Sequence, residues 1–287
     1  MLDNYFLSIS AQKQSLGKIN KLISDSEIIL TVLGTDKQQI LNSGFNQEPS
    51  EILINGNKIN KTDYYVDDLK LEENNITIRF NKTLTNYFRM FYGLSNIKKI
   101  IFSIFDFSGT NTASMLRGCN NLISLDLRKF DTSSVTNMGC MFQDCNKLTS
   151  LDLSNFNTSS TKNMGDMFNG CSNLLSLDLS HFDVSSVTIM GHMFYGSSKL
   201  TSLNLKSFKI SSTQHMDYMF YGCSNLISLD LSNFDTSSVE NMNNMFYGCS
   251  SLPYLLLFIF QLVIWGLHSI FWQILLKILN KLKKIVF

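Results

Sequence analysis

Charged residues and prolines are scarce in this sequence. Charged side chains make up 16% of the 287 residues, whereas an average soluble domain has about 25%. The formal net charge is +1, so the composition gives no electrostatic reason to expect a nucleic-acid partner. Residues 1–20 lack a basic stretch followed by an apolar one, and no secretory signal is therefore predicted.

Residue groupings typical of catalysis are also lacking. The four histidines, His181, His192, His215 and His268, share no carboxylate or serine partner. No glycine-rich phosphate loop follows a predicted strand, and no serine lies in a nucleophile-elbow pattern. The sequence therefore predicts a protein that is not an enzyme and that holds no cofactor and no metal.

The main feature that is present is an internal repeat. The dipeptide Met-Phe recurs every 26 residues, at Met141, Met167, Met193, Met219 and Met245. Columns of leucine and phenylalanine that begin at Leu125, Leu127 and Phe130 keep the same step. Self-similarity at a fixed period of this length is the signature of stacked repeats.

Each repeat unit is interpreted as a strand, a turn and a short helix. In the segment SLDLS the leucines alternate with polar residues, which is the period of a strand with one buried face. Asp-Thr-Ser-Ser follows as a capping and turn cluster, and Val135, Met138, Met141 and Phe142 then recur at one-face helical spacing. The predicted fold class is an α/β repeat solenoid with a parallel β-sheet on one side.

The pattern L-x-x-L-x-L-x-x-F followed by M-F-x-G-C resembles the BspA-type leucine-rich repeat, a 26-residue repeat of surface proteins in bacteria and some protists. The resemblance extends over roughly residues 90–260. It implies a leucine-rich-repeat array and a cell-surface or secreted protein, often an adhesin or antigen, and it does not imply an enzyme.

Four regions are predicted along the chain. Residues 1–25 form a polar extension, and residues 26–85 form a β-rich cap over the first repeat or, alternatively, an independent ligand-binding module. Residues 86–254 are the repeat array. Residues 255–287 are an apolar tail whose first 22 residues carry no formal charge, with His268 counted as neutral.

The apolar tail has three interpretations. It is long enough to cross a bilayer as a helix, and the lysines that follow at Lys277, Lys281, Lys283 and Lys284 favour the cytoplasmic side. It also fits a buried, divergent last repeat, because Leu255, Leu257 and Phe260 keep the repeat register, or an altered reading frame. The expected location is the cell surface or a membrane, with the cytoplasm as the alternative.

Five of the six cysteines share one repeat column. They are Cys119, Cys145, Cys171, Cys223 and Cys249, and Ser197 takes the remaining position in that column. A column of small residues at the end of a predicted helix indicates a packing position. A disulfide or a metal site is the alternative.

The candidate binding site is the outward face of the predicted strands, called the Ser/Asp face below. It consists of two polar columns: Ser124, Ser150, Ser176, Ser202 and Ser228, and Asp126, Asp152, Asp178, Asn204 and Asp230. A solvated polar surface and a calcium site are alternatives to partner binding. The predicted function is non-enzymatic surface interaction or adhesion, with a protein or matrix ligand on this face and the membrane as a second partner through the tail. An intracellular scaffold is the alternative function.

Overall fold

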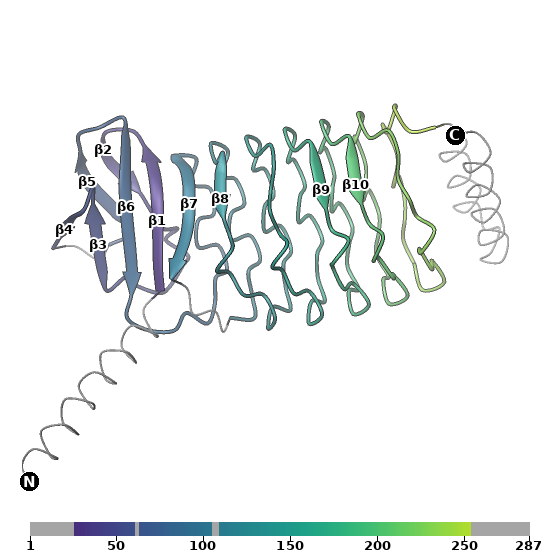
Figure 1. Cartoon of the computed structure of the whole chain (residues 1–287), viewed down its shortest axis with the longest axis horizontal. Helices are drawn as coiled ribbons and strands as arrows, with labels where there is room; N and C mark the ends of the chain where they lie inside the picture. Colours follow the sequence, from purple (N-terminus) through teal and green to yellow (C-terminus); the bar gives the residue numbers. More distant parts are fainter. Residues whose placement is uncertain (1–25, 61–62, 105–108, 254–287) are drawn as a thin grey trace, which may run out of the picture.

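The computed structural model describes residues 26–60, 63–104 and 109–253 (Figure 1). A six-stranded sheet in the order β4-β3-β6-β1-β7-β8 lies at the N-terminal end of this part. Its strands are β1 (Ser26–Leu33), β3 (Glu51–Ile54), β4 (Asn57–Ile59), β6 (Glu73–Phe80), β7 (Ile97–Ile104) and β8 (Ser124–Asp126). A two-stranded sheet pairs β2 (Asp36–Gln39) with β5 (Tyr65–Leu69), so the segment 26–85 is β-rich.

Strand β1 pairs with β6 on one edge and with β7 on the other, and its alternating pattern places one face in the core. Ile28, Leu30 and Val32 alternate with less buried residues and are themselves fully buried. On the other face, the Arg79 guanidinium of β6 contacts the carboxylates of Glu27 at 2.8 Å and Glu51 at 2.5 Å. The last pair of strands in this sheet, β7 and β8, is parallel and extends the sheet into the repeats.

A loop of the N-terminal region closes the first repeat unit. The Asn42 backbone N–H donates to the carbonyl oxygen of Met90 at 2.8 Å, and the Asn42 side-chain amide donates to that of Tyr92 at 2.9 Å. The Gln47 amide donates to the carbonyl oxygen of Asn86 at 2.8 Å. These carbonyl groups face away from the second unit, so the loop acts as a cap for backbone acceptors that would otherwise end the stack.

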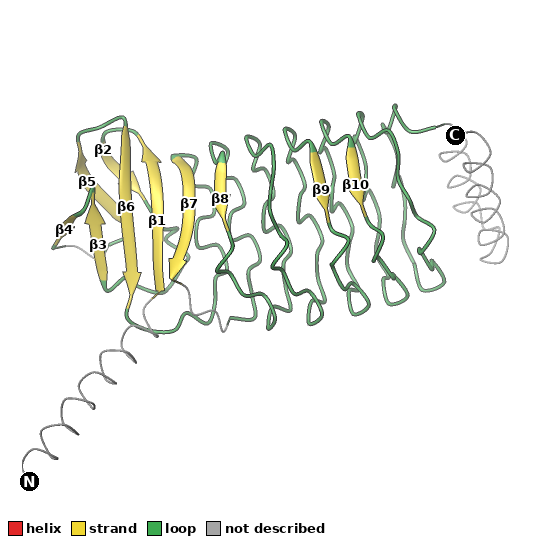
Figure 2. Ribbon diagram, viewed as in Figure 1, coloured by secondary structure: helices red, strands yellow, loops and turns green. Residues whose placement is uncertain are grey.

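The repeat units lie side by side along the length of the molecule, but the predicted fold class is wrong (Figures 1 and 2). No helix occurs in residues 26–60, 63–104 or 109–253, so this is not an α/β leucine-rich-repeat solenoid. The parallel sheet also has fewer strands than predicted. In the later units only β9 (Ser176–Asp178) and β10 (Ser202–Asn204) form a parallel pair, separate from the large sheet.

The segments expected to be helical are chains of tight turns, called turn segments below. In residues 136–145, the N–H groups of Met141 and Gln143 close turns onto the carbonyl groups three residues earlier. Cys140 and Asp144 have φ angles of 57° and 59°, which a right-handed helix does not permit. Hydrophobic residues three apart fit such turns as well as a helix, which is why the sequence pattern was ambiguous.

Alternate N–H groups of each turn segment bond to the next unit. Met138, Cys140, Phe142 and Asp144 donate to the carbonyl oxygens of Asn163, Gly165, Met167 and Asn169 at 2.7–3.0 Å. The corresponding residues of later units repeat this pattern, and parallel bridges link the column Asn111, Asn137, Asn163, Ile189, His215 and Asn241. All backbone donors of the segment thus find acceptors without a helix.

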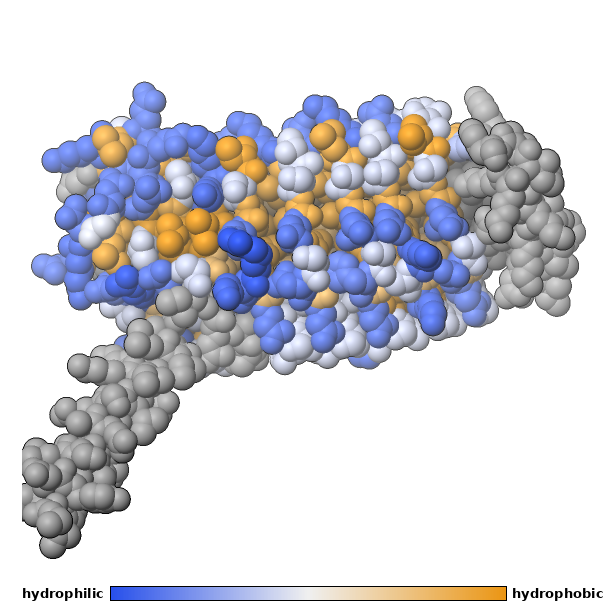
Figure 3. All heavy atoms as spheres, in the orientation of Figure 1, coloured by the Kyte–Doolittle hydropathy of each residue, from blue (hydrophilic) through white to orange (hydrophobic). Residues whose placement is uncertain are grey.

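The predicted core columns are mostly buried. Leu127, Phe130, Met138, Met141 and Phe142 are buried, whereas Leu125 and Leu151 are only partly buried. Rings of one phenylalanine column stack from unit to unit, from Phe142 to Phe246, with centroids 5.3–5.6 Å apart. On the face shown in Figure 3, polar and apolar side chains form rows along the stack.

No helix in the described ranges is long and apolar enough to cross a membrane. The predicted extension 1–25 and the predicted membrane segment or divergent repeat at 255–287 lie outside the described residues.

Candidate functional site

The structure places the Ser/Asp face at the surface. Its five serines are exposed, as are Asp152, Asp178, Asn204 and Asp230, while Asp126 is half-buried. Between β9 and β10, Ser176 lies beside Ser202, and Asp178 lies beside Asn204. Strands occur at only three of the five positions of this face, so part of its polar surface is carried by irregular backbone.

The aspartates of this face also stabilise the local backbone. The carboxylates of Asp152, Asp178 and Asp230 each accept a hydrogen bond at 3.0 Å from the N–H group two residues later. The side-chain oxygen of Asn204 accepts the equivalent bond from Lys206 at 3.3 Å. A side-chain oxygen that closes a turn in this way accounts for an Asp or Asn in every unit, even without a ligand.

Hydrogen bonds also set the acidity of these carboxyl groups. The Arg128 side chain, 2.6 Å from Asp126, lowers the pKa of Asp126. The backbone N–H groups of Ser154 and Ser180 lower the pKa of Asp152 and Asp178, respectively. These three side chains therefore carry negative charge at neutral pH and present regularly spaced acceptors.

Replacing Arg128 with glutamine is expected to raise the pKa of Asp126 toward its ordinary value near 3.9. Because the folded-state pKa of Asp126 is lowered, its contribution to stability is present above the unfolded pKa and is lost as pH falls through the folded value. The variant should therefore lose less stability than the native chain below about pH 4. Carboxyl NMR titration measures the pKa directly, and Asp178 is the internal control because its pKa depends on Ser180 instead. An unchanged Asp126 titration would contradict the assignment of Arg128 as the cause.

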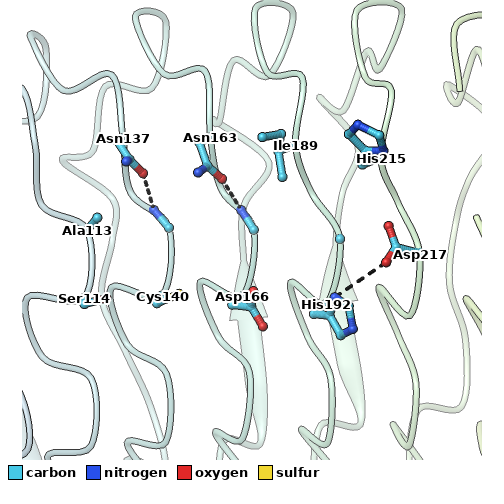
Figure 4. A pocket seen from close by; sticks show the side chains of 13 residues that line it. Ala113, Ser114, Asn137, Cys140, Asn163, Asp166, Ile189, His192, His215 and Asp217 are labelled. Atoms are coloured by element: carbon cyan, nitrogen blue, oxygen red, sulfur yellow. Dashed lines mark hydrogen bonds and ion pairs between the residues drawn. The ribbon is translucent and has the colours of Figure 1, made fainter. Parts of the chain in front are cut away.

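A second surface feature was missed by the sequence interpretation. A groove of about 340 Å³ runs across the turn segments of five units (Figure 4). Its polar lining comprises Ser114, Asn137, Cys140, Asn163, Asp166, His192, His215 and Asp217, and its glycines are Gly139, Gly165 and Gly191. No residue of the Ser/Asp face contributes to it.

The groove brings together residues that are far apart in the chain. The Nδ1 atom of His192 lies 3.8 Å from a carboxylate oxygen of Asp217 in the next unit. The side-chain oxygens of Asn137 and Asn163 accept bonds from Gly139 and Gly165 at 3.0 and 2.9 Å, as Figure 4 shows. The recurring Asn-Met-Gly of the sequence could have indicated the groove, since glycine at one column in three successive units leaves a row without side chains.

An aromatic cluster adjoins the groove through His192. The His192 ring stacks on Tyr218 with centroids 4.9 Å apart, and Tyr195, Tyr221 and Tyr247 stack in a second row at 4.7 and 5.0 Å. Tyr195 also contacts His192 at 5.7 Å. Tyr247 is 64% exposed, so part of this aromatic surface is open to solvent.

The cysteine column lies in the core. Its five thiols are free and buried, and each lies 2.9–3.3 Å from a backbone carbonyl oxygen of a preceding unit. The Ser197 hydroxyl donates an equivalent bond to the Phe168 carbonyl oxygen at 2.9 Å. Burial raises the pKa of Cys119, Cys171 and Cys249 to about 12, so these thiols are protonated and unreactive at neutral pH. They serve as small donors within the packed interior.

The described residues contain no group of three or more His, Cys, Asp or Glu side chains arranged to hold a metal ion. The pair His192 and Asp217 in the groove has no third ligand among the described residues.

The fold defines a repeat protein with a capped N-terminal end, a packed core and two polar surfaces. The family model described as "Mycoplasma protein of unknown function, DUF285" matches residues 85–176 and 172–255. Together these matches cover more than half of the chain, and the chain belongs to this family. No curated protein and no solved structure matched. The family description carries no function, and the resemblance to BspA-type repeats stays a prediction.

Proposed function

We propose that this chain is a non-enzymatic interaction protein that binds a protein or matrix ligand at the cell surface through the Ser/Asp face. The observation that carries the proposal is the regular exposure of this face. A serine hydroxyl recurs once per unit, and an Asp or Asn side chain recurs beside it, on a backbone whose neighbouring units are joined by hydrogen bonds. Repeated, rigidly spaced polar groups favour an extended ligand that makes the same contact several times.

The charge of the face favours a basic ligand surface. Asp152 and Asp178 have lowered pKa values and are not paired by a salt bridge with a basic side chain among the described residues, so complementary lysine or arginine side chains would meet fixed negative charges there. The backbone N–H bonds occupy one lone-pair region of each carboxylate and leave other acceptor sites open. The turn and the ligand therefore use different acceptor sites of the same side chain.

The test is the combined variant Asp126→Asn, Asp152→Asn, Asp178→Asn and Asp230→Asn. Asparagine preserves the turn, because Asn204 already fills this position, and removes only the charge. Binding of the purified full-length chain to decellularised extracellular matrix is expected to weaken roughly tenfold, since exposed ion pairs contribute about 0.2–1 kcal/mol each.

The control is Asp131→Asn, Asp183→Asn and Asp235→Asn, which changes turn-closing aspartates in another column that lies outside the Ser/Asp face. Unchanged matrix binding by the fourfold variant, or equal weakening by the control, would refute the assignment of this face. Thermal unfolding of both variants checks that the fold is retained.

A further inference from the structure

We infer that the groove across the turn segments is a binding site for a neutral oligosaccharide, separate from the Ser/Asp face. The groove volume of about 340 Å³ lies at the lower end of the range of small-molecule sites, which is about 300–1,000 Å³. Gly139, Gly165 and Gly191 belong to its lining, so these three residues add no side chain that narrows the groove.

The groove offers hydrogen-bond donors and acceptors side by side. Asn137 and Asn163 each use the side-chain oxygen to close a turn, which fixes the amide plane and leaves the NH₂ group as a donor. One carboxylate oxygen of Asp166 accepts a hydrogen bond from the Asn169 side-chain amide at 2.7 Å, and the second carboxylate oxygen is a further acceptor. Asp217, beside His192, adds another acceptor.

This combination selects among ligand classes. An anionic ligand would meet Asp166 and Asp217, while no lysine or arginine lines the groove. A cationic ligand would satisfy the carboxylates but would leave the amide donors of Asn137 and Asn163 without acceptors. A sugar hydroxyl both donates and accepts, so vicinal hydroxyls can pair with an amide and a carboxylate together.

The aromatic cluster supplies the apolar part of such a site. His192 belongs both to the groove and to the cluster, and its ring stacks on Tyr218. Tyr195 and Tyr221 continue the aromatic surface beside it. Sugar rings expose apolar C–H groups that pack on aromatic side chains, so an oligosaccharide that hydrogen-bonds in the groove can extend over the tyrosines.

The repeat geometry favours a chain of linked sugar rings over a single ring. Equivalent groove positions recur once per unit, about 4.8 Å apart as neighbouring strands are. Asn137 and Asn163 occupy the same column in successive units, and their side chains have the same orientation in Figure 4. Two successive rings of a linear oligosaccharide can therefore meet equivalent donors, one at Asn137 and one at Asn163.

The test uses cellohexaose, maltohexaose and chitohexaose with the full-length chain, followed by saturation-transfer NMR and calorimetry. Saturable binding of at least one hexasaccharide is expected. Asn163→Asp keeps the turn-closing oxygen and removes the NH₂ donor. It is expected to weaken that binding about fivefold, which is the change in affinity that the loss of one hydrogen bond produces. The control is Asn111→Asp, since Asn111 closes the same turn in the same column outside the groove lining and should bind as the native chain does.

A second variant adds a side chain to the groove lining. A Cβ atom at Gly165 would lie 3.1 Å from Ile189 Cγ2 and 3.3 Å from the Asn163 side-chain oxygen, so Gly165→Ala should narrow the site and weaken binding while the chain still folds. Absence of saturable binding to all three hexasaccharides would overturn the inference. So would equal weakening by Asn163→Asp and Asn111→Asp, or binding of a hexalysine peptide in the groove that Asn163→Asp strengthens, because that result assigns the site to cations.

Discussion

Replacing Phe168 with alanine is expected to lower the free energy of unfolding by about 3–5 kcal/mol. The Phe168 ring is fully buried and stacks on Phe142 at 5.6 Å and on Phe194 at 5.5 Å. Truncation leaves a cavity between two rings, which the stacked units cannot close without losing their backbone bonds. Urea denaturation followed by circular dichroism measures the loss.

The control for Phe168→Ala is Ile227→Ala, which removes an apolar side chain that is 62% exposed. Its effect should stay within about 0.5 kcal/mol, as for most surface substitutions. A similar loss in both variants would contradict the placement of the phenylalanine column in the core. The dependence of the unfolding free energy on urea concentration should be compared between variants, because repeat proteins can unfold in parts.

Replacing Gly222 with valine is expected to destabilise the fold by about 1–3 kcal/mol through backbone strain. Gly222 has φ = 71°, a conformation that β-branched side chains resist. The first side-chain atom fits, since a Cβ atom there would meet its nearest neighbour, the Cα of Gly196, at 3.7 Å. The expected loss follows from the positive φ angle, and chemical denaturation measures it.

The matched control for this position is Gly222→Asn. Asp144 occupies the same repeat column with φ = 59°, and asparagine and aspartate tolerate this conformation better than other side chains do. Asparagine should therefore destabilise the chain clearly less than valine. Equal losses for the two variants would show that the φ angle at this column is not what limits the substitution.

The sequence predicted burial better than backbone conformation. Met138, Met141 and Phe142 are buried, in agreement with their spacing, yet they belong to turns and not to a helix. The spacing alone could not distinguish these structures, because residues three apart lie on one side in both. The positive φ angle at Cys140 was not foreseeable, since cysteine is not a residue that signals it.

The surfaces were predictable to different degrees. The Ser/Asp face follows from alternation along one short segment, so its exposed position could be read from single units. The groove depends on side chains from different columns of neighbouring units, such as His192 and Asp217, whose proximity requires the turn geometry. The repeat column of each histidine therefore gives no sign of this contact.

The hydrogen bonds of the turn segments give the molecule an electrical polarity. In the peptide group between Asn137 and Met138, the carbonyl oxygen accepts from Thr112 of the preceding unit and the N–H donates to Asn163 of the next. Four such peptide groups per turn segment have their dipoles aligned along the stack, as in an α-helix.

Partial negative charge therefore accumulates at the N-terminal end, where the donors of Asn42 and Gln47 neutralise it. Partial positive charge accumulates at the last described unit, where the N–H groups of Met242, Asn244 and Gly248 have no acceptor among the described residues. Carboxylates are thus favoured, and cations disfavoured, next to the last described unit, which makes the first and the last described repeat units electrostatically distinct although the net charge of the chain is close to zero.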